Sequence, residues 1–434
     1  MQKILFLFFL ALVISTSDTI AQTKSIHKSA LLSEASPESV GLSPERLARI
    51  DQMCREEVDN GNLPGIVALV ARNGKIVNWK AYGMANNQEG KEMKRDAIFR
   101  IASQTKAITS TAVMMLWEEG KFQLDDPISK FIPEFKGAKV LTGFSYSDTS
   151  WTGEPVKNEI TIRHLLTHTS GIGYGMIDPD ERFRMIYQKA GIIDAFTTGN
   201  ETIKENIKKL AKLPLHHNPG ENFVYSEGLD VLGYLIEIVS GMPFDKFLKT
   251  HIFDPLGMND TYFYLPDNKT ERMVTVQYEV DGEWQKFPVT PVYDPDYPIK
   301  GAKTFFSGGG GLSSTAKDYA IFLQMYLNGG EYNGIRLLSR KTVDVVLSNQ
   351  IGSIWGDNSD TKFGLAFQLV TGAGQNKGGN GSTGTFSWGG YFNTQYFADP
   401  KENIIGIIMK QTQGPVDDVT GWKFQQLVFQ TIDD

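Results

Sequence analysis

The chain has 434 residues, of which 41% are hydrophobic and 21% are charged, a balance typical of a large globular protein with a substantial core. The formal net charge is −7 at pH 7, and no cluster of lysine and arginine with interleaved aromatic residues occurs. The composition therefore argues against a nucleic-acid partner.

The first 21 residues have the pattern of a secretory leader. Lys3 gives a positive start, residues 4–14 form an apolar run, and residues 19–21 (Thr-Ile-Ala) offer a small-x-small cleavage site. The run is short for a membrane span, and no later segment has enough continuous apolar residues to cross a bilayer. We therefore predict a signal peptide over residues 1–21. The protein is then exported to the periplasm or the extracellular space, without stable membrane insertion after the leader is removed; an uncleaved signal anchor is the alternative.

A polar N-terminal segment, residues 22–35, precedes the first predicted helix. Ser43 followed by Pro44 is typical of a helix start and predicts a helix to about Val58. The single cysteine, Cys54, lies among apolar residues of this helix, and we expect it to be a small core residue rather than a nucleophile. One cysteine also excludes an internal disulfide and a thiolate metal cluster.

Two strands and a helix come next. The strands cover residues 66–71 and 75–82, and Asn73-Gly74 between them favours the positive φ angles of a tight hairpin turn. The helix covers residues 102–119. Because its middle is apolar on most faces, we expect it to be buried.

Helical signals and irregular loops dominate from about residue 121 to 345, with the clearest helices at residues 228–239 and 315–327. The C-terminal part then returns to strands and ends in a helix. These strands are expected at residues 363–370, 386–389, 393–399 and 404–410, and the closing helix at residues 415–432.

Strands at both chain ends thus enclose a mostly helical middle. This order predicts an α+β fold, in which an antiparallel sheet is built from both chain ends and flanked by terminal helices, with a mostly helical lobe inserted. Residues 36–434 then form a single domain. Its sheet region lies at about residues 36–100 and 345–434, and its helical lobe at about residues 121–345.

Two groups of chemically suggestive residues favour a structural role. His164 and His168 stand four residues apart, as two metal ligands on one helix can, but no third ligand and no His-Glu-x-x-His motif accompany them. We predict no metal and no organic cofactor. The glycine run at residues 308–311 lacks a phosphate-binding motif, and we expect it to let backbone pass closely before a helix that Ser314 or Thr315 caps.

The pattern Ser-x-x-Lys points to nucleophilic catalysis, and the chain contains four matches. They are Ser25/Lys28, Ser103/Lys106, Ser314/Lys317 and Ser359/Lys362. The first lies in the polar tail after the leader, and the third starts an ordinary amphipathic helix. The last lies in a polar loop with nothing to desolvate its lysine.

The second match differs because Ser103 begins the buried helix, and Lys106 lies one turn later on the same face. Burial disfavours an ammonium, so a neutral Lys106 could accept the Ser103 proton. Unpaired amides at the helix start would favour the developing negative charge. The pair fits catalysis, but it also fits a capping serine beside a lysine that extends toward solvent.

Residues 99–106 (Phe-Arg-Ile-Ala-Ser-Gln-Thr-Lys) resemble the nucleophile segment of the serine β-lactamase-like hydrolases, which include class C β-lactamases, penicillin-binding D,D-peptidases and related esterases. Three further stretches are similar to that family, which the chain resembles from about residue 36 to 430. They are residues 124–127, 162–171 and 309–316. The resemblance implies a β-lactamase/transpeptidase-like fold and an acyl-enzyme formed on serine.

The family's second motif, Tyr-x-Asn, is matched by Tyr225-Ser226-Glu227. By the resemblance, Tyr225 is the catalytic tyrosine that relays protons between Ser103, Lys106 and the leaving group; a buried loop aromatic is the alternative. Glu227 stands where the family's β-lactamases carry asparagine, and we place it among the substrate-binding residues. A carboxylate there would favour a charged Lys106 and repel anionic substrates, which disfavours efficient hydrolysis of penicillins and cephalosporins.

The third motif, Lys-Thr-Gly, is matched by Trp388-Gly389-Gly390, the form seen in family esterases. A lysine here would help to bind a substrate carboxylate, which Trp388 cannot do, and the two glycines would let substrate approach closely. We assign all three residues to substrate binding, with a plain core aromatic as the alternative for Trp388. The resemblance also implies an oxyanion hole formed by the backbone amides of Ser103 and Tyr391.

Together these interpretations predict an exported serine hydrolase of small-molecule ester, amide or peptide substrates. Ser103 attacks the carbonyl, Lys106 and Tyr225 transfer protons, and water releases the acyl group. The leading prediction is an esterase-like activity. The alternative is a D,D-peptidase, a D-aminopeptidase or a weak β-lactamase, and a third hypothesis is a non-catalytic peptide-binding scaffold.

Overall fold

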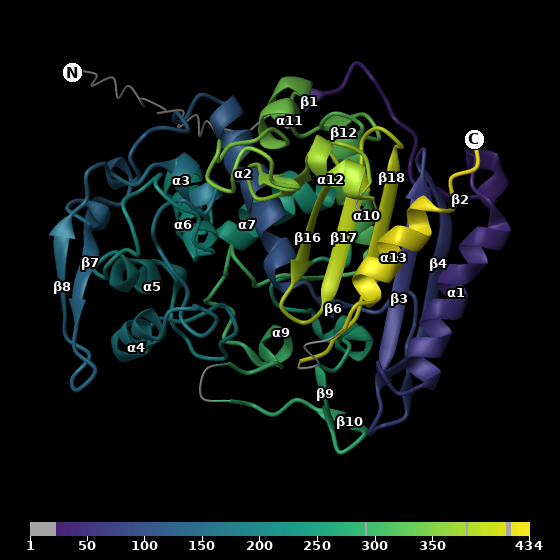
Figure 1. Ribbon diagram of the computed structural model, residues 1–434, viewed down its shortest axis with the longest axis horizontal. Coiled ribbons are helices and arrows are strands. Elements are labelled where there is room, and N and C mark those ends of the chain that lie inside the picture. Colours follow the sequence, from purple (N-terminus) through teal and green to yellow (C-terminus); the bar gives the residue numbers. More distant parts are fainter. Residues whose placement is uncertain (1–22, 291–292, 379–380, 414–417) are drawn as a thin grey trace, which may run out of the picture.

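The computed structural model describes residues 23–290, 293–378, 381–413 and 418–434 (Figure 1). The predicted leader, residues 1–21, lies outside the described residues. In the described ranges, no helix has both the length and the apolar character that crossing a bilayer requires.

A nine-stranded sheet organises the described chain (Figure 1). Its spatial order is β14 (Thr361–Phe363), β15 (Gln368–Val370), β16 (Phe386–Gly390), β17 (Thr394–Asp399), β18 (Ile404–Met409), β3 (Gly65–Arg72), β4 (Lys75–Asn86) and β2 (Ser33–Glu34), with β5 (Lys91–Glu92) also paired to β4. Neighbouring strands are antiparallel except for β2 and β4. Because C-terminal β18 pairs with N-terminal β3, the prediction of a sheet built from both chain ends is confirmed.

Helices cover both faces of this sheet. On one face lie α1 (Pro44–Asp59) and α13 (Thr420–Phe429), which stand in front of the strands in Figure 1. On the other face lie α2 (Thr105–Glu118) and α10 (Ala316–Leu327). Alternate residues of β3 enter the two cores, as the period of a strand requires: Leu69 packs toward α2 and α10, and Val70 toward α1 and α13.

Local sequence signals explain the ends of several elements. The Ser43 hydroxyl accepts a hydrogen bond from the Arg46 N–H at 3.3 Å at the start of α1, as predicted. Asn73 and Gly74 have φ angles of 52° and 73°, which confirms the tight β3–β4 turn. Cys54, a residue of α1, is fully buried in the core between this helix and the sheet, and burial raises the pKa of its thiol to about 12.

The middle of the chain forms a mostly helical lobe at the left of Figure 1. The remaining helices, of the lobe and of the chain after it, are α3 (Ile162–Leu166), α4 (Glu181–Ala190), α5 (Ile203–Leu210), α6 (Gly228–Ser240), α7 (Phe244–Leu248), α8 (Asp254–Leu256), α9 (Tyr297–Lys300), α11 (Arg340–Val346) and α12 (Gly372–Lys377). Short strands outside the main sheet are β1 (Thr23–Lys24), β6 (Phe99–Arg100), β11 (Ser313–Ser314), β12 (Glu331–Tyr332) and β13 (Ile335–Arg336).

The structure differs from the predicted elements in three places. Two hairpins interrupt the lobe, β7 (Lys139–Phe144) with β8 (Trp151–Pro155) and β9 (Gln277–Val280) with β10 (Glu283–Lys286). The single strand predicted at residues 363–370 is two strands, because the chain bends at Ala366, which has a φ of 71°. The closing helix begins at Thr420, and residues 415–417 of its predicted range lie outside the described residues.

Candidate active site

Ser103 lies in a single 3-10 turn, η2 (Ala102–Gln104), that leads directly into α2. Every residue of α2 from Thr105 to Leu116 is buried, as the apolar pattern predicted. The residue before the serine, Ala102, has a φ of 42°, a left-handed conformation that is costly for a residue with a Cβ atom. The surrounding structure therefore imposes the sharp turn that presents Ser103.

Lys106 is 1% exposed, and oxygen atoms surround its amine. Its Nζ donates to the hydroxyl of Tyr174 at 2.8 Å and to the carbonyl of Gly309 at 2.7 Å, and lies 3.3 Å from the Oγ of Ser103. All three partners are uncharged. The alternative of a lysine that extends toward solvent is wrong, because the packed interior encloses the whole side chain.

The ring of Tyr225 also lies near this amine, with its centroid 4.6 Å from the Nζ of Lys106. Its ring packs between Tyr174, at 5.4 Å, and His168, at 4.6 Å. Its hydroxyl accepts a hydrogen bond from the Nε1 of Trp388 at 3.4 Å. The structure thus brings together the three side chains that the motifs single out, and Tyr225 and Ser103 line one cavity.

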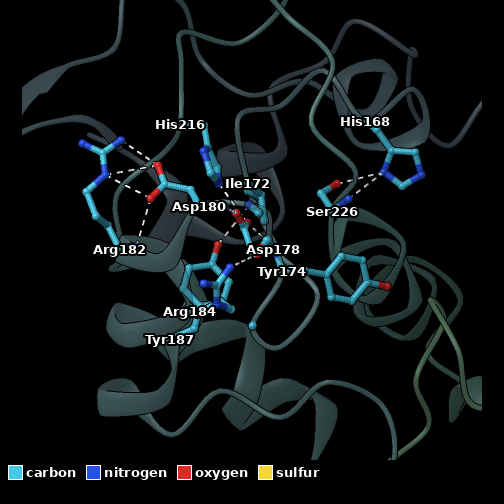
Figure 2. Close-up of polar contacts among 12 residues, drawn as sticks. His168, Ile172, Tyr174, Asp178, Asp180, Arg182, Arg184, Tyr187, His216 and Ser226 are labelled. Atoms are coloured by element: carbon cyan, nitrogen blue, oxygen red, sulfur yellow. Dashed lines mark hydrogen bonds and ion pairs between the residues drawn. The ribbon is translucent and has the colours of Figure 1, made fainter. Parts of the chain in front are cut away.

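The two histidines of the family-like stretch hold backbone in place. His164 accepts the Thr161 N–H at 3.2 Å within a capping box at the start of α3. His168 is fully buried, and its Nδ1 lies 3.0 Å from the Ser226 Oγ and accepts the Ser226 N–H at 3.2 Å (Figure 2). Burial, followed by the charge of Lys106, keeps the pKa of His168 well below its usual value. A neutral His168 therefore fixes the segment that carries Tyr225.

Tyr174 is a site residue that the motifs did not reveal. Its N–H donates to the Oδ2 of Asp178 at 3.0 Å, and the same oxygen lies 2.9 Å from the Nε2 of His216 (Figure 2). The Gly173 N–H donates to the hydroxyl of Tyr187 at 3.1 Å. Burial, followed by the neighbouring Tyr225, raises the pKa of Tyr174 well above its usual value. The loop thus holds a neutral phenol against the amine of Lys106.

The glycine run at residues 308–311 brings backbone to the same amine. A Cβ atom on Gly308 would lie 2.4 Å from the carbonyl oxygen of Leu229, so only glycine allows this close passage beside α6, as predicted. Gly309 donates its N–H to the Oδ1 of Asp230 at 3.1 Å and accepts from Lys106. Thr315 then caps α10, which decides between the two predicted caps.

Strand β16 carries the third motif and passes directly beside Ser103. A Cβ atom on Gly390 would lie 2.4 Å from the carbonyl oxygen of Ile101, so glycine lets the strand approach the turn that carries Ser103. Tyr391, the next residue, and Ser103 both line the two cavities of the site. Trp388 is half-buried and lines the larger cavity, so it is more than a core aromatic.

Two cavities of unequal size meet at Ser103. The larger has a volume of about 430 Å³, within the range of small-molecule sites, and Trp388 and Gly389 line it. The smaller has a volume of about 30 Å³, and Tyr174 and Met176 line it. Ser103 and Tyr391 thus lie where the two cavities meet.

Glu227 is a correction to the predicted substrate-binding set, because its side chain is fully buried and lines neither cavity. Its N–H donates to the carbonyl of Gly173 at 3.1 Å, and its carboxyl interacts with that of Asp194. Asp194 accepts the N–H groups of Gly175, at 3.2 Å, and Met176, at 2.5 Å. Burial, followed by the charge of Asp194, raises the pKa of Glu227 well above its usual value. Glu227 therefore supports the loop behind Lys106 and does not face substrate.

The raised pKa of Glu227 has a measurable consequence for stability. The unfolded carboxyl ionises near 4.5, whereas the folded carboxyl keeps its proton to higher pH, so the native state loses stability as pH rises between the two values. The slope approaches about 1.4 kcal/mol per pH unit for one fully shifted group. In Glu227→Gln, thermal denaturation from pH 5 to 8 should show a smaller fall in Tm than in the native chain. Parallel Tm profiles would contradict the buried acid pair.

The comparisons with known proteins agree with this geometry. The model of the family described as Beta-lactamase matches residues 50–430. The chain belongs to the β-lactamase family. This match confirms the family that the motifs implied, and the mixed sheet with its flanking helices confirms the fold class.

Relatives of this β-lactamase family member include hydrolases of two kinds. Esterase EstB of Burkholderia gladioli is 29% identical over 386 residues, which cover 84% of this chain and 90% of EstB. An Escherichia coli K12 protein, named provisionally as a D-alanyl-D-alanine carboxypeptidase, is 28% identical and covers 91% of this chain and 89% of its own. The solved structure of "EstCE1, a hydrolase with promiscuous acyltransferase activity" is 26% identical, with a TM-score of 0.76, and covers 90% of this chain and 98% of its own. The β-lactamase family member is thus related to serine hydrolases that include esterases.

Proposed function

We propose that the protein is an esterase that cleaves small esters through an acyl-enzyme on Ser103. The observation that carries this proposal is the buried amine of Lys106, which uncharged oxygens hold 3.3 Å from the Ser103 Oγ beside the ring of Tyr225. A lysine that serves only packing or solvation would not require this arrangement. In this position the amine lies beside the Ser103 hydroxyl, from which it takes the proton in the proposed reaction.

The first half of the reaction forms the acyl-enzyme. The Oγ of Ser103 attacks the ester carbonyl carbon while Lys106 takes its proton, which in this proposal passes on to Tyr225. The backbone amides of Ser103 and Tyr391 stabilise the oxyanion of the tetrahedral intermediate. Collapse of the intermediate breaks the bond to the alcohol oxygen, which receives a proton from Tyr225.

The second half releases the acyl group. A water molecule takes the place of the departed alcohol and attacks the acyl carbonyl, and the same lysine and tyrosine accept its proton. The oxyanion forms again between the two amides. Its collapse returns the proton to the Oγ of Ser103 and frees the carboxylic acid.

Trp388 favours esters over β-lactams and cell-wall peptides. It stands where a lysine would bind a substrate carboxylate, and its indole instead donates to Tyr225 and lines the larger cavity. A neutral ring gives no charge with which to hold an anion. The relatives EstB and EstCE1 support this choice, and the E. coli relative makes a D,D-carboxypeptidase the second candidate.

A substrate panel with mass spectrometry tests the proposal. Purified protein is given p-nitrophenyl acetate, nitrocefin and a D-Ala-D-Ala peptide, and intact-mass spectra after rapid quenching follow the acyl adduct. We expect ester turnover and an acetyl group on Ser103. Cleavage of the peptide alone would support the second candidate, and no adduct with any acyl donor would support a non-catalytic scaffold.

Removal of one hydroxyl tests the role of Tyr174. Tyr174→Phe keeps the ring against Tyr225 but removes an oxygen partner of Lys106, so the amine is held less precisely. We expect kcat for p-nitrophenyl acetate to fall by about 10- to 100-fold, with little change in KM. Tyr187→Phe is the matched control, because it removes a hydroxyl of α4 that accepts the N–H of Gly173 in the same loop and does not contact Lys106. An unchanged kcat in Tyr174→Phe would contradict this role.

We also propose export, on the strength of the leader pattern at residues 1–21. Expression of the full chain in a Gram-negative host, followed by fractionation, should give mature protein in the periplasm or medium that lacks these residues. Full-length protein retained in the membrane fraction would support an uncleaved anchor instead.

A further inference from the structure

The two cavities at Ser103 differ in what lines them, and this difference orients the substrate. Ser103 and Tyr391 line both cavities, so the carbonyl carbon and its oxyanion belong at the junction. Tyr225 lines only the larger cavity. Because Tyr225 gives the proposed proton to the departing alcohol, the alcohol lies in the larger cavity and the acyl group in the smaller one.

The smaller cavity limits the acyl group to a very short chain. Its volume of about 30 Å³ is small beside the volume of about 430 Å³ of the larger cavity. Asp194, Ala195, Phe196 and Gly310 are among the residues that line it. A Cβ atom added to Gly310 would lie 3.1 Å from the Cβ of Ala195. The acyl group therefore has much less room than the alcohol, which favours the methyl group of an acetyl ester over an extended chain.

The larger cavity is a groove that runs from Trp388 across β16 and β17 to the start of α13. Phe397 and Trp422 contribute to its walls, and none of the described residues that line it carries a charge. A Cβ atom added to Gly421 would lie 1.6 Å from the Oε1 of Gln395, so the glycine keeps the helix start close to the strand. Trp422 is 60% exposed, and an exposed indole at the end of an apolar groove favours a ligand-binding surface.

We propose that the site is specific for acetyl esters of bulky, uncharged, apolar alcohols, with the alcohol in the groove that ends at Trp422. This inference rests on the proposed esterase function and adds the substrate class and its orientation. Water in place of the alcohol then reaches the acetyl-enzyme through the same groove.

Two substrate series test the orientation in the purified protein. The first varies the acyl group from p-nitrophenyl acetate to butyrate and octanoate, and the second varies the alcohol from ethyl acetate to 2-(2-naphthyl)ethyl acetate. We expect kcat/KM to fall at least about tenfold from acetate to octanoate and to rise at least about tenfold with the naphthyl alcohol.

Variants of residues in each cavity test which cavity binds the alcohol and which binds the acyl group. Trp422→Ala should raise KM for the naphthyl ester about tenfold and leave ethyl acetate unchanged, whereas Tyr146→Ala, at an aromatic residue of similar exposure on a distant loop, should change neither. Met176→Ala enlarges the smaller cavity and should move the acyl preference from acetate toward butyrate. Preference for octanoate, with an effect of Trp422→Ala on the acyl series, would overturn this inference and leave the esterase intact. No turnover of any ester would overturn both.

Discussion

Replacement of Ser103 by alanine is expected to lower kcat for p-nitrophenyl acetate by at least about 10⁴-fold and to abolish the acetyl adduct. The variant loses the Oγ of Ser103, which lies 3.3 Å from the Nζ of Lys106, at a residue that lines the larger cavity. The two amides and the cavity remain, so binding of the ester persists while chemistry stops. Initial rates and intact-mass spectra measure the two effects.

Ser110→Ala is the matched control for this variant. Ser110 lies on the same buried helix, where its Oγ donates to the carbonyl of Leu365 at 3.0 Å, away from the cavities. The control should lose about 1 kcal/mol of stability and keep its activity. Equal activities of the two variants would show that another nucleophile carries the reaction.

Replacement of Lys106 by methionine is the second change with a very large expected effect. Methionine keeps most of the volume but cannot accept the Ser103 proton, and it leaves the Tyr174 hydroxyl and the Gly309 carbonyl without their partner. We expect kcat to fall by at least about 10³-fold, because a general base is lost from a nucleophile that depends on it. Stopped-flow rates of acyl-enzyme formation measure the loss directly.

Lys362 provides the comparison for this variant, since it belongs to another Ser-x-x-Lys match. It is 8% exposed, and its Nζ donates to the carbonyls of Gly352 at 2.9 Å and Gly356 at 2.6 Å. Lys362→Met should cost about 1–3 kcal/mol of stability and leave kcat unchanged, because it orphans two carbonyls of residues that line neither cavity. A similar fall in kcat for both lysine variants would indicate general destabilisation rather than a lost base.

The sequence predicted the sheet because its strands have strong local patterns. The alternation of β4, the continuous apolar run of β3 and Asn73-Gly74 between them all act within a few residues. The β7–β8 hairpin lacked such a pattern, since its residues are mostly exposed or half-exposed and mixed in polarity. The bend at Ala366 depends on contacts with distant segments, such as the N–H that Ala366 donates to the carbonyl of Leu166.

The candidate site was predicted only where its residues belong to family-like motifs. Tyr174 lies three residues beyond the similar stretch at residues 162–171, in a glycine-rich loop with no element pattern, so nothing local marked it. The burial of Lys362 was also missed, because the surrounding sequence is polar and the lysine is enclosed by loop carbonyls instead of apolar side chains. The motif predicted the position of Glu227 beside Tyr225, but it did not predict that the Glu227 side chain is buried. This burial depends on packing against a distant segment, the loop of Gly173, whose carbonyl accepts the Glu227 N–H.

The burial of Cys54 leaves the protein without a reactive native thiol, which simplifies site-specific labelling. The chain has no second cysteine, and the thiol of Cys54 is both enclosed in the core and held protonated at ordinary pH. A fluorophore attached through Trp422→Cys would therefore report from the groove alone, without first removing a native thiol.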